Sequence, residues 1–224
     1  MVWDRELPRL RRELEAARQA GVTQALLGHI GQLPLARSFG LTPRGDFGLG
    51  LTNDETAAEL ARLGFASATA SFESRLAQIR DLSKPLDLEL LVYGRLPLML
   101  MEHCILRNRG QGCHCQDKPQ SLGDRKGEHF PVEPAWGCRN ELFNAKPLWL
   151  ADKTDWRTAG AAYARLAFLR EGPGECARVF RAYREGAGEP PRAFTRGALL
   201  SGGGVGGSLR WGRRSFRPPL ERQG

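Results

Sequence analysis

Short apolar segments alternate with helical segments through the first hundred residues, and this alternation limits the fold more than any other feature of the chain. Strands are expected at residues 23–29, 46–51, 66–71 and 88–93. Between them, helices are expected at 57–63 and 74–82, and a short helix or turn at 33–39. Because parallel strands need a crossover connection, usually a helix, such alternation predicts parallel β/α units. Each unit is about 20 to 25 residues long, close to the repeat of a β/α barrel.

The segments on either side of this region fit the same fold class. Residues 4–20 are expected to form an amphipathic helix, because Leu7, Leu10, Leu14 and Ala17 recur at helical spacing. Thr52 or Asn53 is the expected N-cap of the helix at 57–63. Further strands are expected at 148–151 and 163–169, and a further helix at 175–185.

Composition excludes some classes of protein. Hydrophobic residues make up 41% of the 224 residues, which is enough for a core and argues against a disordered chain. No apolar run approaches the roughly 18 residues that cross a bilayer, and the N-terminus lacks the apolar run of a signal peptide. We therefore expect a cytoplasmic protein with no membrane partner.

The net charge of +8 is uneven along the chain, because residues 198–224 are rich in glycine and arginine. This tail is expected to be disordered, and the alternative is an arm that binds nucleic acid.

Four of the five cysteines fall within residues 104–138, namely Cys104, Cys113, Cys115 and Cys138. Thiols in a reducing compartment hold metals more often than they form disulfides. Thiolates suit iron–sulfur clusters and zinc, and His103 and His114 would complete a zinc site instead. The fifth cysteine, Cys176, lies on an expected helix and is interpreted as a buried structural thiol.

Basic residues surround these cysteines, in a region of little periodicity that is expected to be a Cys-rich loop over residues 104–146. Such side chains bind phosphate or carboxylate, and the alternative is that they solvate the loop. The set is Arg95, Arg107, Arg109, Arg125 and Lys126.

Residues 89–104, Glu-Leu-Leu-Val-Tyr-Gly-Arg-Leu-Pro-Leu-Met-Leu-Met-Glu-His-Cys, resemble the signature region of the collagenase-like peptidase family U32. The closest likeness is to the branch that carries Val-Tyr-Gly-Arg-Leu-Pro-Leu-Met. Segments 45–53, 124–131, 138–148 and 194–197 resemble the same family in the same order. The likeness covers most of residues 4–197.

This resemblance implies a TIM-like β/α barrel, and a [4Fe–4S] cluster that serves oxygen-independent hydroxylation. The targets in such proteins are RNA pyrimidines or the ring of a quinone precursor. Because family members have further strands before this N-terminus, a partial barrel with a Cys-rich loop insertion is expected. Its parts would be barrel units in 1–103, the cluster-binding loop in 104–146, β/α units in 147–197 and the tail in 198–224.

The family pattern also guides the choice of ligands. A usual family cysteine is replaced here by Pro97, and a later one by Trp149, near which Cys138 is the expected substitute. The expected cluster ligands are therefore Cys104, Cys113, Cys115 and Cys138. The position left open is that of either member of the close pair, Cys113 or Cys115, or of Cys176.

The substrate is expected to meet Glu89, Tyr93, Arg95 and Arg125. Glu89 and Tyr93 belong to a strand whose carboxyl end is where sites gather in a β/α barrel, and strand alternation turns one of Glu89 and Leu90 inward.

Three functions remain from the sequence. The favoured one is a cluster-dependent hydroxylase or RNA-modifying protein, with RNA or a small anionic molecule as substrate. The second is a collagenase-like peptidase, although the chain has no Gly-x-Ser-x-Gly and no His-Glu-x-x-His motif. The third is a non-catalytic subunit whose partner chain completes the barrel.

Overall fold

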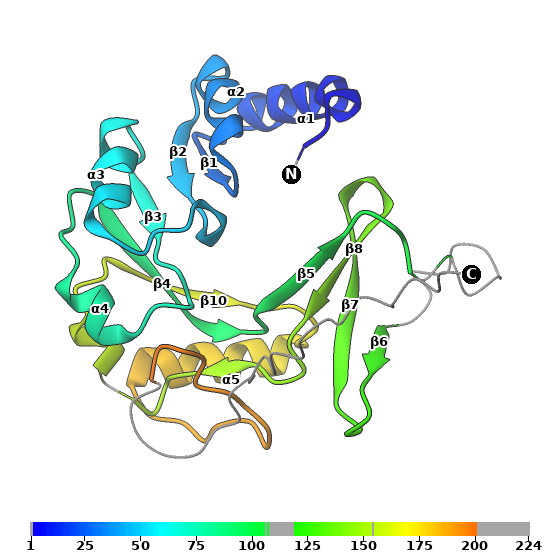
Figure 1. Ribbon diagram of the computed structural model, residues 1–224, viewed down its shortest axis with the longest axis vertical. Coiled ribbons are helices and arrows are strands. Elements are labelled where there is room, and N and C mark those ends of the chain that lie inside the picture. Colours follow the sequence, from blue (N-terminus) through cyan, green and yellow to red (C-terminus); the bar gives the residue numbers. More distant parts are fainter. Residues whose placement is uncertain (1, 106, 108–118, 154, 201–224) are drawn as a thin grey trace, which may run out of the picture.

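The structure is a computed structural model, and it describes residues 2–105, 107, 119–153 and 155–200. It contains a mostly parallel sheet alternating with helices, and a separate antiparallel sheet (Figure 1). The parallel strands run side by side in the order β1 (Gln24–Leu27), β2 (Thr42–Gly45), β3 (Ser67–Thr69), β4 (Asp87–Gly94) and β10 (Tyr163–Ala167). The short strand β9 (Leu148–Trp149) pairs antiparallel with the end of β4.

Helices connect the first four parallel strands in turn, which confirms the predicted α/β class. The α-helices are α1 (Leu7–Gln19), α2 (Leu33–Ser38), α3 (Asp54–Arg62), α4 (Leu76–Asp81) and α5 (Pro173–Glu185). Five short 3₁₀ helices are also described: η1 (Asp4–Glu6), η2 (Ile30–Gln32), η3 (Phe47–Leu49), η5 (Trp136–Cys138) and η6 (Asp155–Thr158). The parallel strands form an open sheet, with β1 and β10 at its two edges, rather than a closed barrel within the described ranges.

Two local expectations near the second strand had different outcomes. Asn53 is the N-cap of α3, and its Oδ1 accepts the amide hydrogen of Thr56 at 2.8 Å. The strand expected at 46–51 is wrong, because Asp46 instead accepts the amide hydrogen of Phe47 at 2.8 Å and starts η3. The true strand, β2, precedes it and contains Pro43, a residue that depresses strand signals.

The first strand was correctly located, although only part of it is buried. Leu27 is buried in β1, whereas Leu26 is 53% exposed. The reason is position, because β1 lies at the edge of the sheet and pairs with β2 on one side.

The core lies between the parallel sheet and its helices. Leu90 and Val92 of β4 are almost fully buried, as are Ile79 of α4 and Val179 of α5. The Tyr183 hydroxyl ties α5 to the sheet, because it donates to the Val92 carbonyl at 2.6 Å and accepts the Leu150 amide hydrogen at 2.7 Å. Burial therefore fixes β4 at the centre of the molecule.

The antiparallel sheet corrects the expectation of a loop over 104–146. Its order is β5 (Pro97–Met101), β8 (Arg139–Phe143), β7 (His129–Ala135) and β6 (Gln120–Gly123). The strands were missed because β7 carries Pro131 and Pro134, and because few of their side chains are buried. Pairing with neighbours, rather than an apolar pattern, creates these strands.

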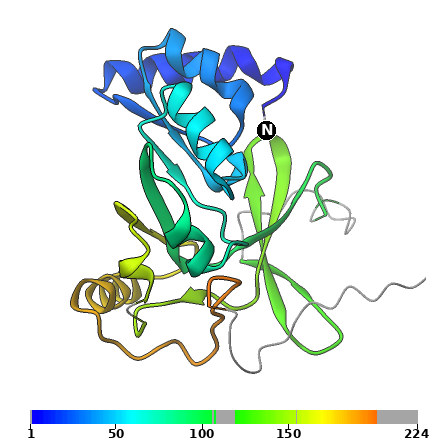
Figure 2. The same cartoon turned by 60° about the vertical axis from the view of Figure 1, so that its left-hand side comes forward.

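The antiparallel sheet begins beside the carboxyl ends of the parallel strands, because Pro97 follows the end of β4 by three residues. Two views show this sheet projecting beside the parallel sheet, with the start of the chain close to its upper end (Figures 1 and 2). The antiparallel sheet is therefore an extension from the carboxyl end of β4.

Two further findings concern the tail and the membrane. Leu199, in the segment expected to be disordered, is 4% exposed, and its carbonyl accepts the Leu76 amide hydrogen at 3.0 Å. The remainder of the expected tail, 201–224, lies outside the described residues. Among the helices that the structure describes, none has both the length and the apolar character to cross a membrane.

Candidate functional site

A cavity of about 440 Å³ lies where β5 ends and β8 begins. It brings together Cys104 and Cys138, two of the predicted cluster ligands, although they are far apart in the sequence. Its other lining residues are Arg5, Glu102, His103, Arg107 and Gly137. Cys113, Cys115, His114 and Arg109 lie outside the described residues.

Cys138 has an unusual backbone. Its φ angle is +62°, and it is the one non-glycine residue with positive φ in the part of the chain that the structure describes. Gly137 before it has φ of +74°. The left-handed region costs a residue with a Cβ atom about 1–2 kcal/mol. Residues held in such conformations cluster at functional sites, so the turn that carries this thiol is a candidate functional position.

Arg139 follows Cys138 and is 3% exposed. Its Nε donates to Glu102 Oε2 at 2.8 Å, and its Nη2 donates to Glu6 Oε1 at 2.6 Å. Its Nη1 also donates to the Trp136 carbonyl at 3.2 Å. One guanidinium therefore joins the N-terminal segment, the end of β5 and the turn that carries Cys138.

The charge of Arg139 acts on both carboxylates. The hydrogen bond from Arg139 holds the pKa of Glu102 below its usual value. Burial alone would raise the pKa of Glu6, but hydrogen bonds from Arg139 and from the Trp3 amide lower it on balance. Both carboxylates therefore stay ionised at neutral pH, and the cavity wall keeps its ion pairs.

Asn140 is the next residue and is 1% exposed. Its Oδ1 accepts the amide hydrogen of Ile105 at 2.8 Å, and its Nδ2 donates to the Arg139 carbonyl at 3.1 Å. Ile105 directly follows Cys104, so Asn140 fixes the backbone beside the second thiol.

The described residues alone do not form a complete metal site. No group of three or more His, Cys, Asp or Glu side chains within the described ranges is placed to hold a metal ion. The cavity supplies two thiols, and the other two predicted ligands, Cys113 and Cys115, lie outside the described residues. Arg5 and Arg107 make the opening basic, with Arg5 paired to Glu102 at 3.1 Å.

A second polar cluster, which the sequence did not predict as a group, lies where β2 and β3 end, beside Glu89 near the start of β4 and Arg165 in the middle of β10. Arg165 of β10 donates to Asp46 at 2.6 Å and to Thr69 at 2.9 Å, and it also pairs with Glu89. Thr69 donates to Glu89 at 2.7 Å. A signal existed, because Arg165 interrupts an apolar strand and Asp46 follows β2 directly, but the sequence does not show that they meet.

Glu141 of β8 approaches this strand-end cluster from the antiparallel sheet. Burial raises the pKa of Glu141, and the negative charge of Asp46 raises it further. Glu133 lies directly opposite Glu141 in the pairing of β7 with β8, and Glu133 forms an ion pair with Arg170. Carboxylates from both sheets therefore converge here, and Arg165 balances part of their charge.

The four predicted substrate residues have separate surroundings. Glu89 belongs to the strand-end cluster, whereas Tyr93 is 1% exposed and donates its hydroxyl hydrogen to Glu171 at 2.9 Å. Arg95 donates to the carbonyls of Asn144 and Ala145, and Arg125 is exposed in the turn between β6 and β7. Neither of the two cavities described here is lined by any of the four.

Cys176 also lies away from the two-thiol cavity. It is on α5, and its thiol donates to the Glu171 carbonyl at 3.5 Å. The structure therefore groups Cys104 with Cys138 and leaves Cys176 in a separate place.

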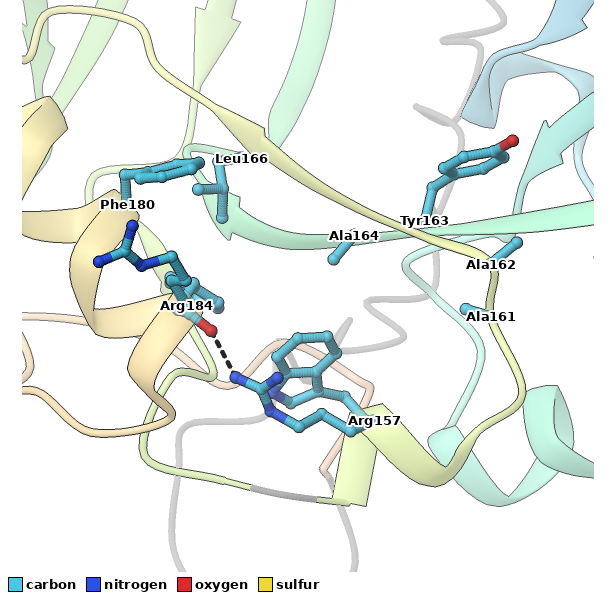
Figure 3. A pocket seen from close by; sticks show the side chains of 10 residues that line it. Arg157, Ala161, Ala162, Tyr163, Ala164, Leu166, Phe180 and Arg184 are labelled. Carbon is cyan, nitrogen blue, oxygen red and sulfur yellow. Dashed lines mark hydrogen bonds between the residues drawn. The ribbon is translucent and has the colours of Figure 1, made fainter.

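A second cavity, of about 420 Å³, lies between the edge strand β10 and α5 (Figure 3). Alanines, Leu166 and Phe180 line much of it, and Arg157 donates to the Tyr183 carbonyl at one end. Because none of its lining residues is an acid, a histidine or a cysteine, it has no ligands for a metal.

Comparison with models of known protein families, with curated proteins and with solved structures found no match to this chain.

Proposed function

We propose that the chain is a member of the collagenase-like peptidase family U32 and holds a [4Fe–4S] cluster for oxygen-independent hydroxylation or RNA base modification. The observation that carries this proposal is the shared cavity of Cys104 and Cys138. The family resemblance had selected both thiols as ligands, and the fold brings them to one place.

Such a cluster has two of its expected ligands in the part of the chain that the structure describes. It is held by four thiolates, and two thiols line the cavity. Cys113 and Cys115 lie between those two in the sequence, so one excursion of the chain carries all four. Zinc is the alternative, since His103 lines the same cavity and would join thiolates in a tetrahedral site.

When bound, the cluster would supply one-electron chemistry. The chain itself would bind and orient the substrate. Arg5 and Arg107 place positive charge at the cavity, which suits a phosphate or carboxylate group on RNA or on a small anion. The Glu102 carboxylate stays ionised and paired with Arg139. It therefore stabilises the cavity wall and does not exchange protons with a substrate.

The test is anaerobic purification of the full chain, with iron and sulfide analysis. We expect about four irons per chain in the wild type, and loss of most of the iron in Cys104→Ser and Cys138→Ser. Cys176→Ser is the matched control and should keep its iron, because its thiol lies on α5. A wild-type protein without iron after anaerobic reconstitution would contradict the proposal, and binding of one zinc would favour the alternative.

A second candidate function is that of a subunit whose partner chain completes the barrel. The supporting observation is the open parallel sheet, where Leu26 is 53% and Val22 is 44% exposed beside the edge strand β1. Unpaired sheet edges bind further strands. Sedimentation analysis tests this idea, since a monomer at all concentrations, alone and with cell extract, would count against it.

A further inference from the structure

We infer that Arg139 and Asn140 are positioning residues that set the separation of the Cys104 and Cys138 thiols. This inference rests on the proposed function, because it gives the two thiols a common ligand. It adds a pair of residues that neither the cysteine spacing nor the family resemblance assigned to the site.

The argument starts from sequence position. Arg139 and Asn140 follow Cys138 directly, so their backbone is the backbone that carries this thiol. Their side chains contact residues on both sides of the other cysteine in the sequence. Arg139 binds Glu102, two residues before Cys104, and Asn140 binds the amide of Ile105, one residue after it. Cys104 is therefore held between two contacts that both originate beside Cys138.

Burial makes these contacts specific. Arg139 is 3% and Asn140 is 1% exposed. The Glu6 side chain is 10% exposed, so little water competes for its pair with Arg139, whereas the Glu102 side chain is 53% exposed. The Arg139 fork also binds Glu6 and the Trp136 carbonyl, which ties the left-handed turn at Gly137 and Cys138 to the N-terminal segment. A lysine has one ammonium group instead of a planar guanidinium. It is therefore unable to donate to Glu102, Glu6 and the Trp136 carbonyl together.

A purely structural role is a weaker explanation for this arrangement. A buried ion pair is often no more stabilising than well-packed apolar residues of the same volume. Residues that orient metal ligands, by contrast, change metal affinity by about 10- to 100-fold when they are replaced. Both partners of this pair flank a predicted ligand, which favours positioning over stability.

The experiment measures how tightly the Cys104 and Cys138 thiols bind one arsenic(III) centre in the absence of iron. In the full chain with Cys113→Ser, Cys115→Ser and Cys176→Ser, phenylarsine oxide is titrated into the reduced protein. The arsenic(III) centre forms two As–S bonds with the two thiols, and its oxygen leaves as water with the two thiol protons. We expect one arsenical per chain, and binding about 10-fold weaker or worse in Arg139→Lys and in Asn140→Leu.

Arg62→Lys is the matched control, because Arg62 is an exposed arginine paired with Glu59 on α3. It should bind the arsenical as tightly as the background protein. Circular dichroism establishes that each variant is folded at the titration temperature. Iron content in the otherwise wild-type chain is the second measurement, and Arg139→Lys and Asn140→Leu should each lose most of it.

The outcomes are separable. Unchanged arsenical affinity and iron content in folded Arg139→Lys and Asn140→Leu would overturn the inference, as would a background protein whose two thiols fail to share one arsenic. If the arsenical binds as expected while the wild type takes up no iron or zinc, the pairing of the thiols stands and the proposed function fails.

Discussion

The parallel and antiparallel sheets of this protein are built on different principles. Leu90 and Val92 of β4 are 1% and 0% exposed, and helices cover the sheet that contains them. In the antiparallel sheet, Leu98, Met99 and Leu100 of β5 are each about half exposed. Apolar burial holds the first sheet together, whereas backbone pairing and the polar contacts of Arg139 and Asn140 hold the second.

The parallel sheet therefore supplies most of the stability, whereas the antiparallel sheet carries the two thiols of the candidate site. Hydrophobic burial is nondirectional, so it fixes a sheet strongly but places few polar groups with accuracy. Hydrogen bonds and ion pairs are directional, and they set the positions of Cys104, Cys138 and their neighbours. The same division occurs where functional residues lie on segments that a rigid scaffold positions.

The largest expected effect comes from the parallel sheet. Leu90→Ala removes a buried side chain from β4 and should lower the free energy of unfolding by about 2–5 kcal/mol, as core leucines do. Urea denaturation measures it. Leu100→Ala in β5, where the side chain is 47% exposed, should cost less than about 0.5 kcal/mol. Equal losses in the two variants would remove the distinction between the sheets.

A smaller effect is expected where the two sheets approach each other. Arg165→Met removes the cation that joins Asp46 and Glu89, and it leaves two partly buried carboxylates close together. We expect about 2 kcal/mol of destabilisation, less than for a fully buried pair, because Arg165 is 20% exposed. Urea denaturation again provides the measurement, with Arg62→Met as the control that should leave the midpoint unchanged.

The strained turn offers a matched pair of variants. Cys138→Gly and Cys138→Ala both lose the thiol, but glycine accepts the φ of +62° without the steric cost that alanine has. We expect the glycine variant to be the more stable of the two metal-free proteins by about 1 kcal/mol. Thermal unfolding of the two proteins decides the point. If alanine is as stable as glycine, the turn stores no strain.

The smallest expected effect depends on pH. The folded state raises the pKa of Glu141, so ionisation of Glu141 lowers stability once the pH exceeds the pKa of the unfolded chain. Glu141→Gln should therefore stabilise the protein at neutral pH, by about 0.5 kcal/mol for a carboxylate opposite another. The gain should shrink as the pH falls below the usual glutamate pKa. A constant gain across urea titrations at pH 4 to 8 would contradict this.

The sequence predicted those parts of the fold that a few neighbouring residues encode. The strand β4, the cap at Asn53 and the helix α5 follow from periodicity and capping, which act over a few residues. The same reasoning misplaced β2, because Pro43 weakens the strand signal and the apolar run after Asp46 imitates one. It missed β6, β7 and β8, where strand formation depends on pairing across the sheet.

For the candidate site, the sequence by itself determined the chemistry: soft thiol donors in one excursion, with basic residues around them. The tertiary structure decided which of them meet. It placed Cys104 and Cys138 on one cavity, gave Arg139 a partner 133 residues away in Glu6, and joined Arg165 to Asp46 across the sheet. The physical reason is the sequence separation over which each interaction acts. Periodicity and capping act between near neighbours, whereas a directional contact between distant segments exists only after the chain has folded.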